Sequence, residues 1–202
     1  LDATALGSIT RPSDSGTVVT DAVGLLNMYE YQSSYNGGAN GYLRNGLDWW
    51  TITPYNTSSM WDVGSDGGTS YNNPSTAYGI RPSLNLKSNI KIVDGNGTID
   101  DPYRLEGDHD IVPSGTLLKD RYSGEYLTFG TGENNLYRIV SHENGIGTKV
   151  VSAEPLKDSG IFKEIIFGNN VTFSSINTVG SFLNGEYLTS YVGDDYDNMI
   201  EE

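Results

Sequence analysis

Short runs of alternating apolar and polar residues, separated by Gly, Asn and Ser, occupy most of the chain. The clearest runs lie at 47–54, 59–63, 78–86, 126–129, 136–141, 148–152 and 162–167. A period of two places successive side chains on opposite faces of a strand. The turn sequences between the runs predict antiparallel hairpins and long loops. The pattern therefore predicts an α+β fold, mostly antiparallel β with short helices and long loops.

Two segments have a helical pattern. Asn27 precedes one of them and suits an N-cap, and Glu30 stands at the third helical position, as in a capping box. The segment 176–191 places Phe182, Leu183 and Leu188 on one apolar face. Both helices are predicted to be short.

A turn-rich, acidic stretch at 94–116 interrupts the strands. We expect a boundary there, which divides the chain into residues 1–105, a linker at 106–118, and residues 119–202. The chain begins at Leu1, so we expect it to be a piece of a longer protein.

The composition supports a folded core and limits the partners. Of the 202 residues, 36% are hydrophobic, with 14 Tyr, 5 Phe and 3 Trp, which excludes a wholly disordered chain. The formal charge of −14 repels nucleic acid and anionic membrane surfaces, and we expect no membrane insertion. There is no cysteine, so disulfides and thiolate metal sites are excluded.

The aromatic residues between 49 and 61 have two interpretations. Trp50, Tyr55 and Trp61 are candidates for a platform that stacks on sugar rings. The competing interpretation is core packing, which a domain of this size needs. Trp49 and Trp50 point to opposite faces of a strand, so at most one of them joins a given surface.

Two other groups of residues suggest electrostatic interactions. Arg81 lies among apolar residues, which favours a buried salt bridge to Asp48 or Asp62. Asp94, Asn96, Asp100 and Asp101 alternate as the oxygen ligands of a calcium loop do, although the Glu at the twelfth position of an EF-hand is missing. The competing interpretation of this segment is a solvated turn without calcium.

Several motifs resemble a known group of proteins. The segments Trp49-Trp50-Thr51-Ile52-Thr53-Pro54, Trp61-Asp62-Val63 and Gly79-Ile80-Arg81-Pro82-Ser83-Leu84 resemble an uncharacterised surface module of Gram-positive bacteria. That module is similar to the C-type-lectin-like fold shared with the formylglycine-generating enzymes. The residues Asn-Gly-Thr-Ile-Asp-Asp-Pro-Tyr-Arg-Leu at 96–105 resemble its usual ending.

The second half of the chain resembles the opening half of the same module, through Ser123-Gly124-Glu125-Tyr126, Tyr137-Arg138-Ile139-Val140 and Leu183-Asn184-Gly185-Glu186-Tyr187. The order is therefore permuted: the tail of one module precedes the head of the next. Either the halves meet within one chain, or they are exchanged between neighbouring chains, or the chain is one window of a continuous array. Exchange head to tail generates a filament unless the rotation closes.

The resemblance implies an extracellular protein of the bacterial cell surface whose partners are neighbouring copies, adjacent modules or glycans. The paired cysteines of the formylglycine-generating enzymes are absent, and no segment resembles a nucleophile elbow, so we expect no enzymatic activity. The expected function is a structural and adhesive module, a repeating unit of a surface stalk or fibre. The alternative is a carbohydrate-binding, lectin-like adhesin, and a hydrolase is the remote alternative.

Overall fold

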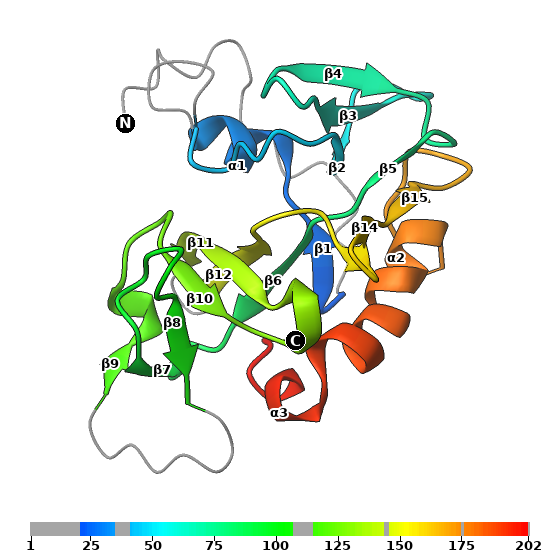
Figure 1. The fold of residues 1–202 in the computed structure, drawn as a ribbon. Helices are drawn as coiled ribbons and strands as arrows, with labels where there is room; N and C mark the ends of the chain where they lie inside the picture. The colour runs from blue at the N-terminus through cyan, green and yellow to red at the C-terminus, as the bar shows by residue number, and fades with distance from the viewer. Residues whose placement is uncertain (1–20, 35–40, 107–114, 144–145, 175, 202) are drawn as a thin grey trace.

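The computed structural model describes residues 21–34, 41–106, 115–143, 146–174 and 176–201. In this part of the chain, strands form two main sheets and the helices are few and short (Figure 1). Among the described residues, all strand pairs are antiparallel except β10 (Tyr126–Thr128) with β8 (Tyr103–Leu105) and β2 (Trp49–Pro54) with β5 (Ala77–Gly79). The predicted α+β class, dominated by antiparallel β, is therefore confirmed.

The larger sheet has eight strands in the order β1-β6-β12-β11-β10-β8-β7-β9. Their bounds are β1 Val23–Leu25, β6 Pro82–Leu86, β7 Lys91–Asp94, β8 Tyr103–Leu105, β9 Thr116–Leu117, β10 Tyr126–Thr128, β11 Leu136–Glu143 and β12 Gly147–Ser152.

The smaller sheet has five strands in the order β15-β5-β2-β3-β4. They are β2 Trp49–Pro54, β3 Met60–Val63, β4 Thr69–Asn72, β5 Ala77–Gly79 and β15 Glu164–Ile166. A separate hairpin pairs β13 (Lys157–Asp158) with β14 (Ile161–Phe162).

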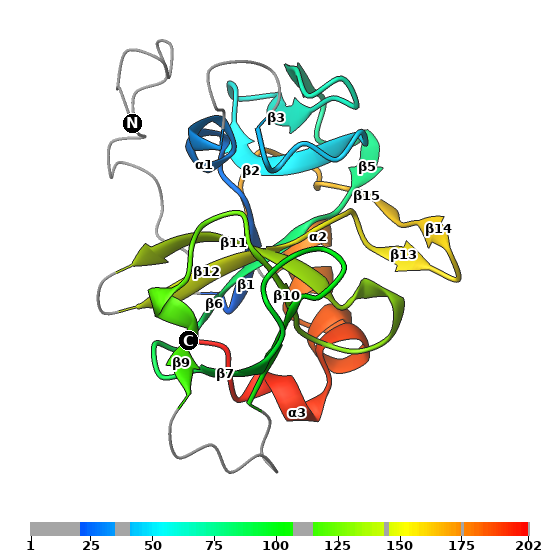
Figure 2. The ribbon, with the colours of Figure 1, turned by 60° about the vertical axis from the view of Figure 1, so that its left-hand side comes forward.

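The helical segments are short. They are α1 Met28–Ser33, α2 Thr178–Leu183, α3 Asp194–Asp197, the 3-10 turns η2 Leu118–Asp120 and η3 Gly132–Asn134, and the π-helical turn η4 Leu188–Val192. In Figure 2 the smaller sheet and α1 lie above the larger sheet. Helix α2 lies beside β15 and β1, and α3 lies at the bottom of the view.

The predicted capping box at the start of α1 is confirmed. Asn27 Oδ1 accepts from the Glu30 main-chain N–H at 2.8 Å, and Glu30 Oε2 accepts from the Asn27 N–H at 2.9 Å. The expected helix at 176–191 is replaced by α2 and η4, separated by a break at Asn184, the C-cap of α2.

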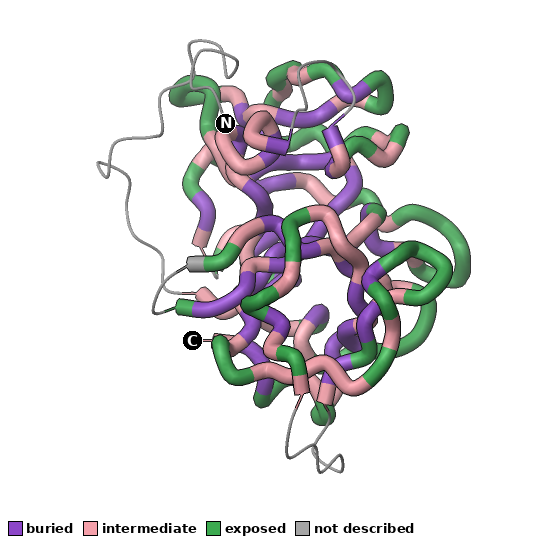
Figure 3. The backbone as a smooth tube through the Cα atoms, turned by 90° about the vertical axis from the view of Figure 1, so that its left-hand side faces the viewer, coloured by how far each residue is buried: buried purple, intermediate pink, exposed green. Residues whose placement is uncertain are grey.

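Two apolar clusters fill the interior, which Figure 3 shows as buried chain at the centre and exposed chain at the loops. The main cluster includes Trp50 and Leu84 from the first half and Ile139 and Phe167 from the second. The second cluster lies beneath α1 and packs Tyr31 against Trp49, with ring centroids 5.3 Å apart. Both clusters draw on residues before and after the expected linker.

The two halves of the sequence also share the larger sheet. Strand β6 of the first half pairs with β12 of the second, with Leu84 opposite Val150. Near the end of the chain, Ile200 forms a bridge with Leu86. Part of the expected linker belongs to the folded structure, because Thr116 pairs with Ile92 in the larger sheet and Leu118 is buried in the main apolar cluster. Residues 107–114 of the linker lie outside the described part.

Candidate binding surface

The three tryptophans have different positions. Trp49 and Trp50 are both fully buried, in the second and the main apolar cluster respectively, as the expectation of opposite faces requires. The indole N–H of Trp50 donates to the Ile165 carbonyl at 3.2 Å. Trp50 therefore does not reach a surface ligand, and the sequence-based choice of this residue for the site is corrected: it stabilises the core. Trp61, by contrast, is only partly buried against the second cluster.

Trp61 is one of three rings that form an aromatic cluster on the smaller sheet. Strands β3 and β4 are antiparallel, and their register places Trp61 directly opposite Tyr71. Residues opposite each other in a strand pair have side chains on the same face. Tyr55, just after β2, completes the cluster, which we call the aromatic cluster: Tyr55, Trp61 and Tyr71.

The two tyrosines of the aromatic cluster stack on each other. Their ring centroids are 3.9 Å apart and their planes differ by 9°. The Trp61 centroid lies 5.0 Å from Tyr55 and 6.0 Å from Tyr71, and its plane is nearly perpendicular to both. Trp61 must therefore lie at the side of the stack, because a ring at its end would be much farther from one tyrosine than from the other.

This geometry leaves the outer faces of Tyr55 and Tyr71 without an aromatic neighbour among the described residues. The two residues are 44% and 49% exposed, so a large part of each side chain remains open to solvent. Exposed aromatic rings with a free face bind flat apolar surfaces, such as the C–H face of a sugar or another ring. The chemistry available at this surface is stacking.

Tyr71 is a site residue that the sequence interpretation missed. The sequence contains the signal for it. If the turn at 64–68 pairs Val63 with Thr69, then two residues farther along each strand Trp61 lies opposite Tyr71. The stacking of Tyr55 on Tyr71 could not be counted in this way, because Tyr55 follows β2 in a loop and its side-chain direction is not set by strand alternation.

The opposite face of β3 carries a buried carboxyl group. Asp62 is 3% exposed and accepts a hydrogen bond from Asn72 Nδ2 at 2.9 Å. Burial raises the pKa of Asp62 above its usual value, and the hydrogen bond from Asn72 offsets part of this shift. The neighbouring charge of Asp48 raises the pKa further.

The expected salt bridge from Arg81 to Asp48 or Asp62 is wrong. Arg81 is fully buried, and its guanidinium donates to the main-chain carbonyls of Leu43, Ser152 and Ala153 at 2.8 to 3.2 Å. It also lies 4.6 Å from the centroid of the Trp49 ring. Burial, together with the nearby charge of Arg138, lowers the pKa of Arg81 to about 9. Arg81 therefore ties the two halves together without a carboxylate among the described residues.

The proposed calcium ligands lie in a loop that is closed by its own hydrogen bonds. Asp94 Oδ1 accepts from the Gly95 N–H, and Asn96 Oδ1 accepts from both the N–H and the hydroxyl of Thr98. In the parts of the chain that the structure describes, no three His, Asp or Glu residues gather in a group that could hold a metal ion. The geometry of Asp94, Asn96, Asp100 and Asp101 thus gives the calcium interpretation no support.

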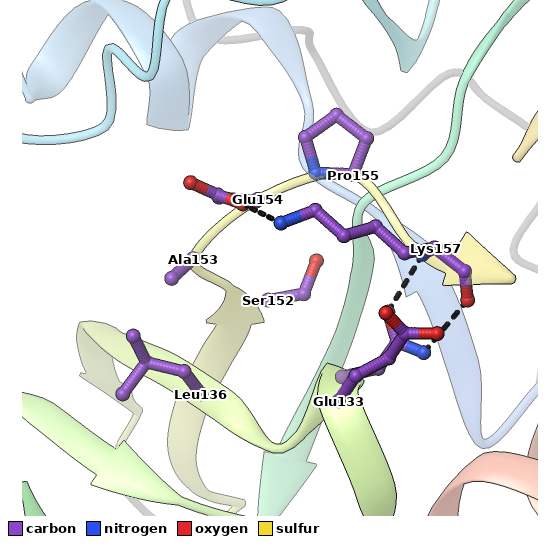
Figure 4. Close-up of a pocket in the computed structure, with 8 residues that line it drawn as sticks. Glu133, Leu136, Ser152, Ala153, Glu154, Pro155 and Lys157 are labelled. Carbon is purple, nitrogen blue, oxygen red and sulfur yellow. Dashed lines mark hydrogen bonds and ion pairs between the residues drawn. The ribbon is translucent and has the colours of Figure 1, made fainter. Parts of the chain in front are cut away.

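A small cavity of about 220 Å³ lies between η3 and the segment after β12. Figure 4 shows its lining residues Glu133, Leu136, Ser152, Ala153, Glu154, Pro155 and Lys157. The charged groups have partners within the protein, since Lys157 pairs with Glu154 at 2.6 Å and Glu133 accepts from the Gly160 N–H. The side chain of Asn134 accepts a hydrogen bond from the Lys157 main-chain N–H and donates one to the Lys157 carbonyl. These contacts stabilise the loop.

Comparison with known proteins yields one match. A family model described as a domain of unknown function, DUF6273, matches residues 14–88, the segment that carries the aromatic cluster. No curated protein and no solved structure matches the chain. None of the helices in the described part of the chain has the length and apolar character needed to cross a membrane.

Proposed function

We propose that the chain is a non-catalytic, extracellular adhesion module of a bacterial surface that binds carbohydrate through the aromatic cluster. The observation that carries the proposal is the stack of Tyr55 and Tyr71, half-exposed at the surface with Trp61 at its side. Sugar rings present C–H faces that pack on aromatic faces, and aromatic residues dominate the energetics of such contacts. The finer proposal for the fold is C-type-lectin-like, supported by the short antiparallel strands, the long loops and the sequence motifs.

The test is a glycan array followed by titration of the best ligand, monitored by tryptophan fluorescence. Trp49 and Trp50 are fully buried, so Trp61 is the tryptophan whose emission and quenching respond to a surface ligand. We expect Tyr71→Ala and Tyr55→Ala each to weaken binding roughly 10-fold, as the loss of one stacking contact implies.

Tyr122→Ala provides the matched control. Tyr122 is 71% exposed and lies outside the aromatic cluster, so this variant removes a surface tyrosine without changing the stack. It should bind as the unmodified chain does. Absence of binding to any glycan, or binding that survives both Tyr55→Ala and Tyr71→Ala, would refute the proposal.

A structural role as the repeating unit of a stalk or fibre is the second candidate. The permuted order that the motif resemblance implies favours it, because modules of this kind can follow one another in a tandem array. The pairing of β6 with β12 inside one chain means that exchange of halves between chains is not needed to complete the sheet. A stalk would then be built from closed modules joined end to end.

A further inference from the structure

The segments that carry the aromatic cluster contain no charged side chain. Residues 49–61 and 67–80 include no Asp, Glu, Lys, Arg or His, although 19% of the whole chain is charged. The charged residues between these segments are Asp62, which is buried on the opposite face of β3, and Asp66 in the turn. One oxygen of Asp66 already accepts a hydrogen bond from the Gly68 N–H at 2.7 Å.

The loops beside the rings offer neutral polar groups instead. The exposed loop after Tyr55 carries Asn56, Thr57 and Ser58, and the loop after β4 carries Asn73. The side-chain oxygen of Asn56 is used by Ser58, and that of Asn73 by Ser75, so each turn is held by its own residues. The amide nitrogens of both Asn side chains have no protein partner among the described residues and can donate to an external oxygen.

We propose that the aromatic cluster binds uncharged glycans, so that affinity comes from stacking and from neutral hydrogen bonds rather than from ion pairs. This inference rests on the proposed function. An anionic glycan meets the repulsion of a protein with a formal charge of −14 and finds no arginine or lysine in the segments that carry the rings. A cationic glycan finds no carboxylate in those segments either.

The inference predicts how binding depends on salt. Ion pairs at an exposed surface weaken as salt shortens the screening length from about 30 Å to a few Å, whereas stacking does not. The affinity for an uncharged glycan should therefore change less than about 2-fold between about 0.01 M and about 0.5 M NaCl.

The experiment uses matched hexasaccharides with glucose and galactose backbones, each as the neutral form, the uronate form and the 2-amino form. Binding is measured by calorimetry at both salt concentrations for the unmodified chain, Tyr71→Ala and the Tyr122→Ala control. We expect at least one neutral hexamer to bind at high salt, to lose roughly 10-fold in affinity in Tyr71→Ala, and to bind Tyr122→Ala normally. At low salt the amino forms should gain affinity equally in all three proteins, because that attraction comes from the net charge.

Two outcomes would overturn the inference, and they are distinguishable. If a uronate or amino form binds more tightly than its neutral counterpart at high salt and requires Tyr71, the cluster is a glycan site but not a neutral one. If none of the hexamers binds and the wider glycan array is also negative, the carbohydrate function itself fails.

Discussion

Arg81 shows how a single residue can join two halves of a chain. Its guanidinium donates to Leu43 from the first half and to Ser152 and Ala153 from the second. These acceptors are main-chain carbonyls, which become unsatisfied inside the protein if the side chain is shortened or made apolar. The cost of leaving buried polar groups unpaired exceeds the average value of a hydrogen bond.

Replacing Arg81 with Met should therefore lower the free energy of unfolding by about 3–5 kcal/mol, because several buried carbonyls lose their donor at once. Urea denaturation would measure the change. Lys119→Met is the control, since Lys119 pairs with Asp120 at the exposed surface and its loss should cost less than about 1 kcal/mol. A small effect of Arg81→Met would indicate that water replaces the guanidinium.

Asp62 makes stability depend on pH. Burial raises the pKa of this carboxyl group, so the folded state binds the proton more tightly than the unfolded state. The stability that comes from this tighter proton binding is fully present at pH values below the usual Asp pKa. It is lost as the pH rises through the raised pKa of the folded state. Asp62→Asn can keep the hydrogen bond from Asn72 while removing the buried charge.

We therefore expect Asp62→Asn to be more stable than the unmodified chain at pH 7, with the difference shrinking as pH falls toward about 4. Thermal unfolding at a series of pH values would test this. The exposed Asp100→Asn serves as the control, with an expected change within about 0.5 kcal/mol. Destabilisation by Asp62→Asn at pH 7 would mean that the ionised carboxylate is required.

Tryptophan substitutions separate the core from the aromatic cluster. Trp50→Ala removes a fully buried ring and should lower the free energy of unfolding by about 3–5 kcal/mol. Trp61→Ala removes a partly buried ring and should lower it by less, about 1–3 kcal/mol. The free energies of unfolding measured in denaturant would show the order. Equal losses would place Trp61 in the core and weaken its assignment to the binding surface.

At the scale of the elements, the edge of the larger sheet is closed by a side chain. Strand β1 has only three residues, and Asn184, the C-cap of α2, binds the main chain of Val23 through both the oxygen and the nitrogen of its side-chain amide. Asn184 Oδ1 accepts from the Val23 N–H and Nδ2 donates to the Val23 carbonyl, both at 3.0 Å. The amide thus takes the place of a neighbouring strand, which protects the edge from pairing with another chain.

Asn184→Ala should cost about 1–3 kcal/mol, because both main-chain groups of Val23 lose a partner. Hydrogen exchange at Val23 should become faster than at residues in β12, which has a strand on each side. The exposed Asn169→Ala is the control and should leave both quantities unchanged. Unchanged exchange at Val23 in Asn184→Ala would show that the clamp does not stabilise β1.

For the whole molecule, the pairing of β6 with β12 predicts the state of the protein in solution. The sheet and both apolar clusters are completed within one chain, so we expect a monomer in dilute solution. Size-exclusion chromatography with light scattering over a range of concentrations would test this. Dimers or longer species would contradict closure within one chain and would instead be expected if neighbouring chains exchange their halves.

The sequence interpretation was accurate for contacts between residues close together in the chain and failed for contacts between distant residues. The capping box of α1 and the β11–β12 hairpin were predicted because their partners are a few residues apart. Arg81 was assigned the wrong partners, because the carbonyls of Leu43 and Ser152 carry no information in their residue types. Tyr71 was missed although its register with Trp61 was readable from the turn.

The sequence by itself determined the mostly antiparallel β character, the acidic surface and the absence of thiol chemistry, because strand alternation, charge and composition are local or additive properties. Only the tertiary structure decided which tryptophans are buried, that strands from both halves share one sheet, and that Tyr55 and Tyr71 form a stack. These depend on contacts between residues distant in the chain, where a one-residue change of register would move a side chain to the opposite face.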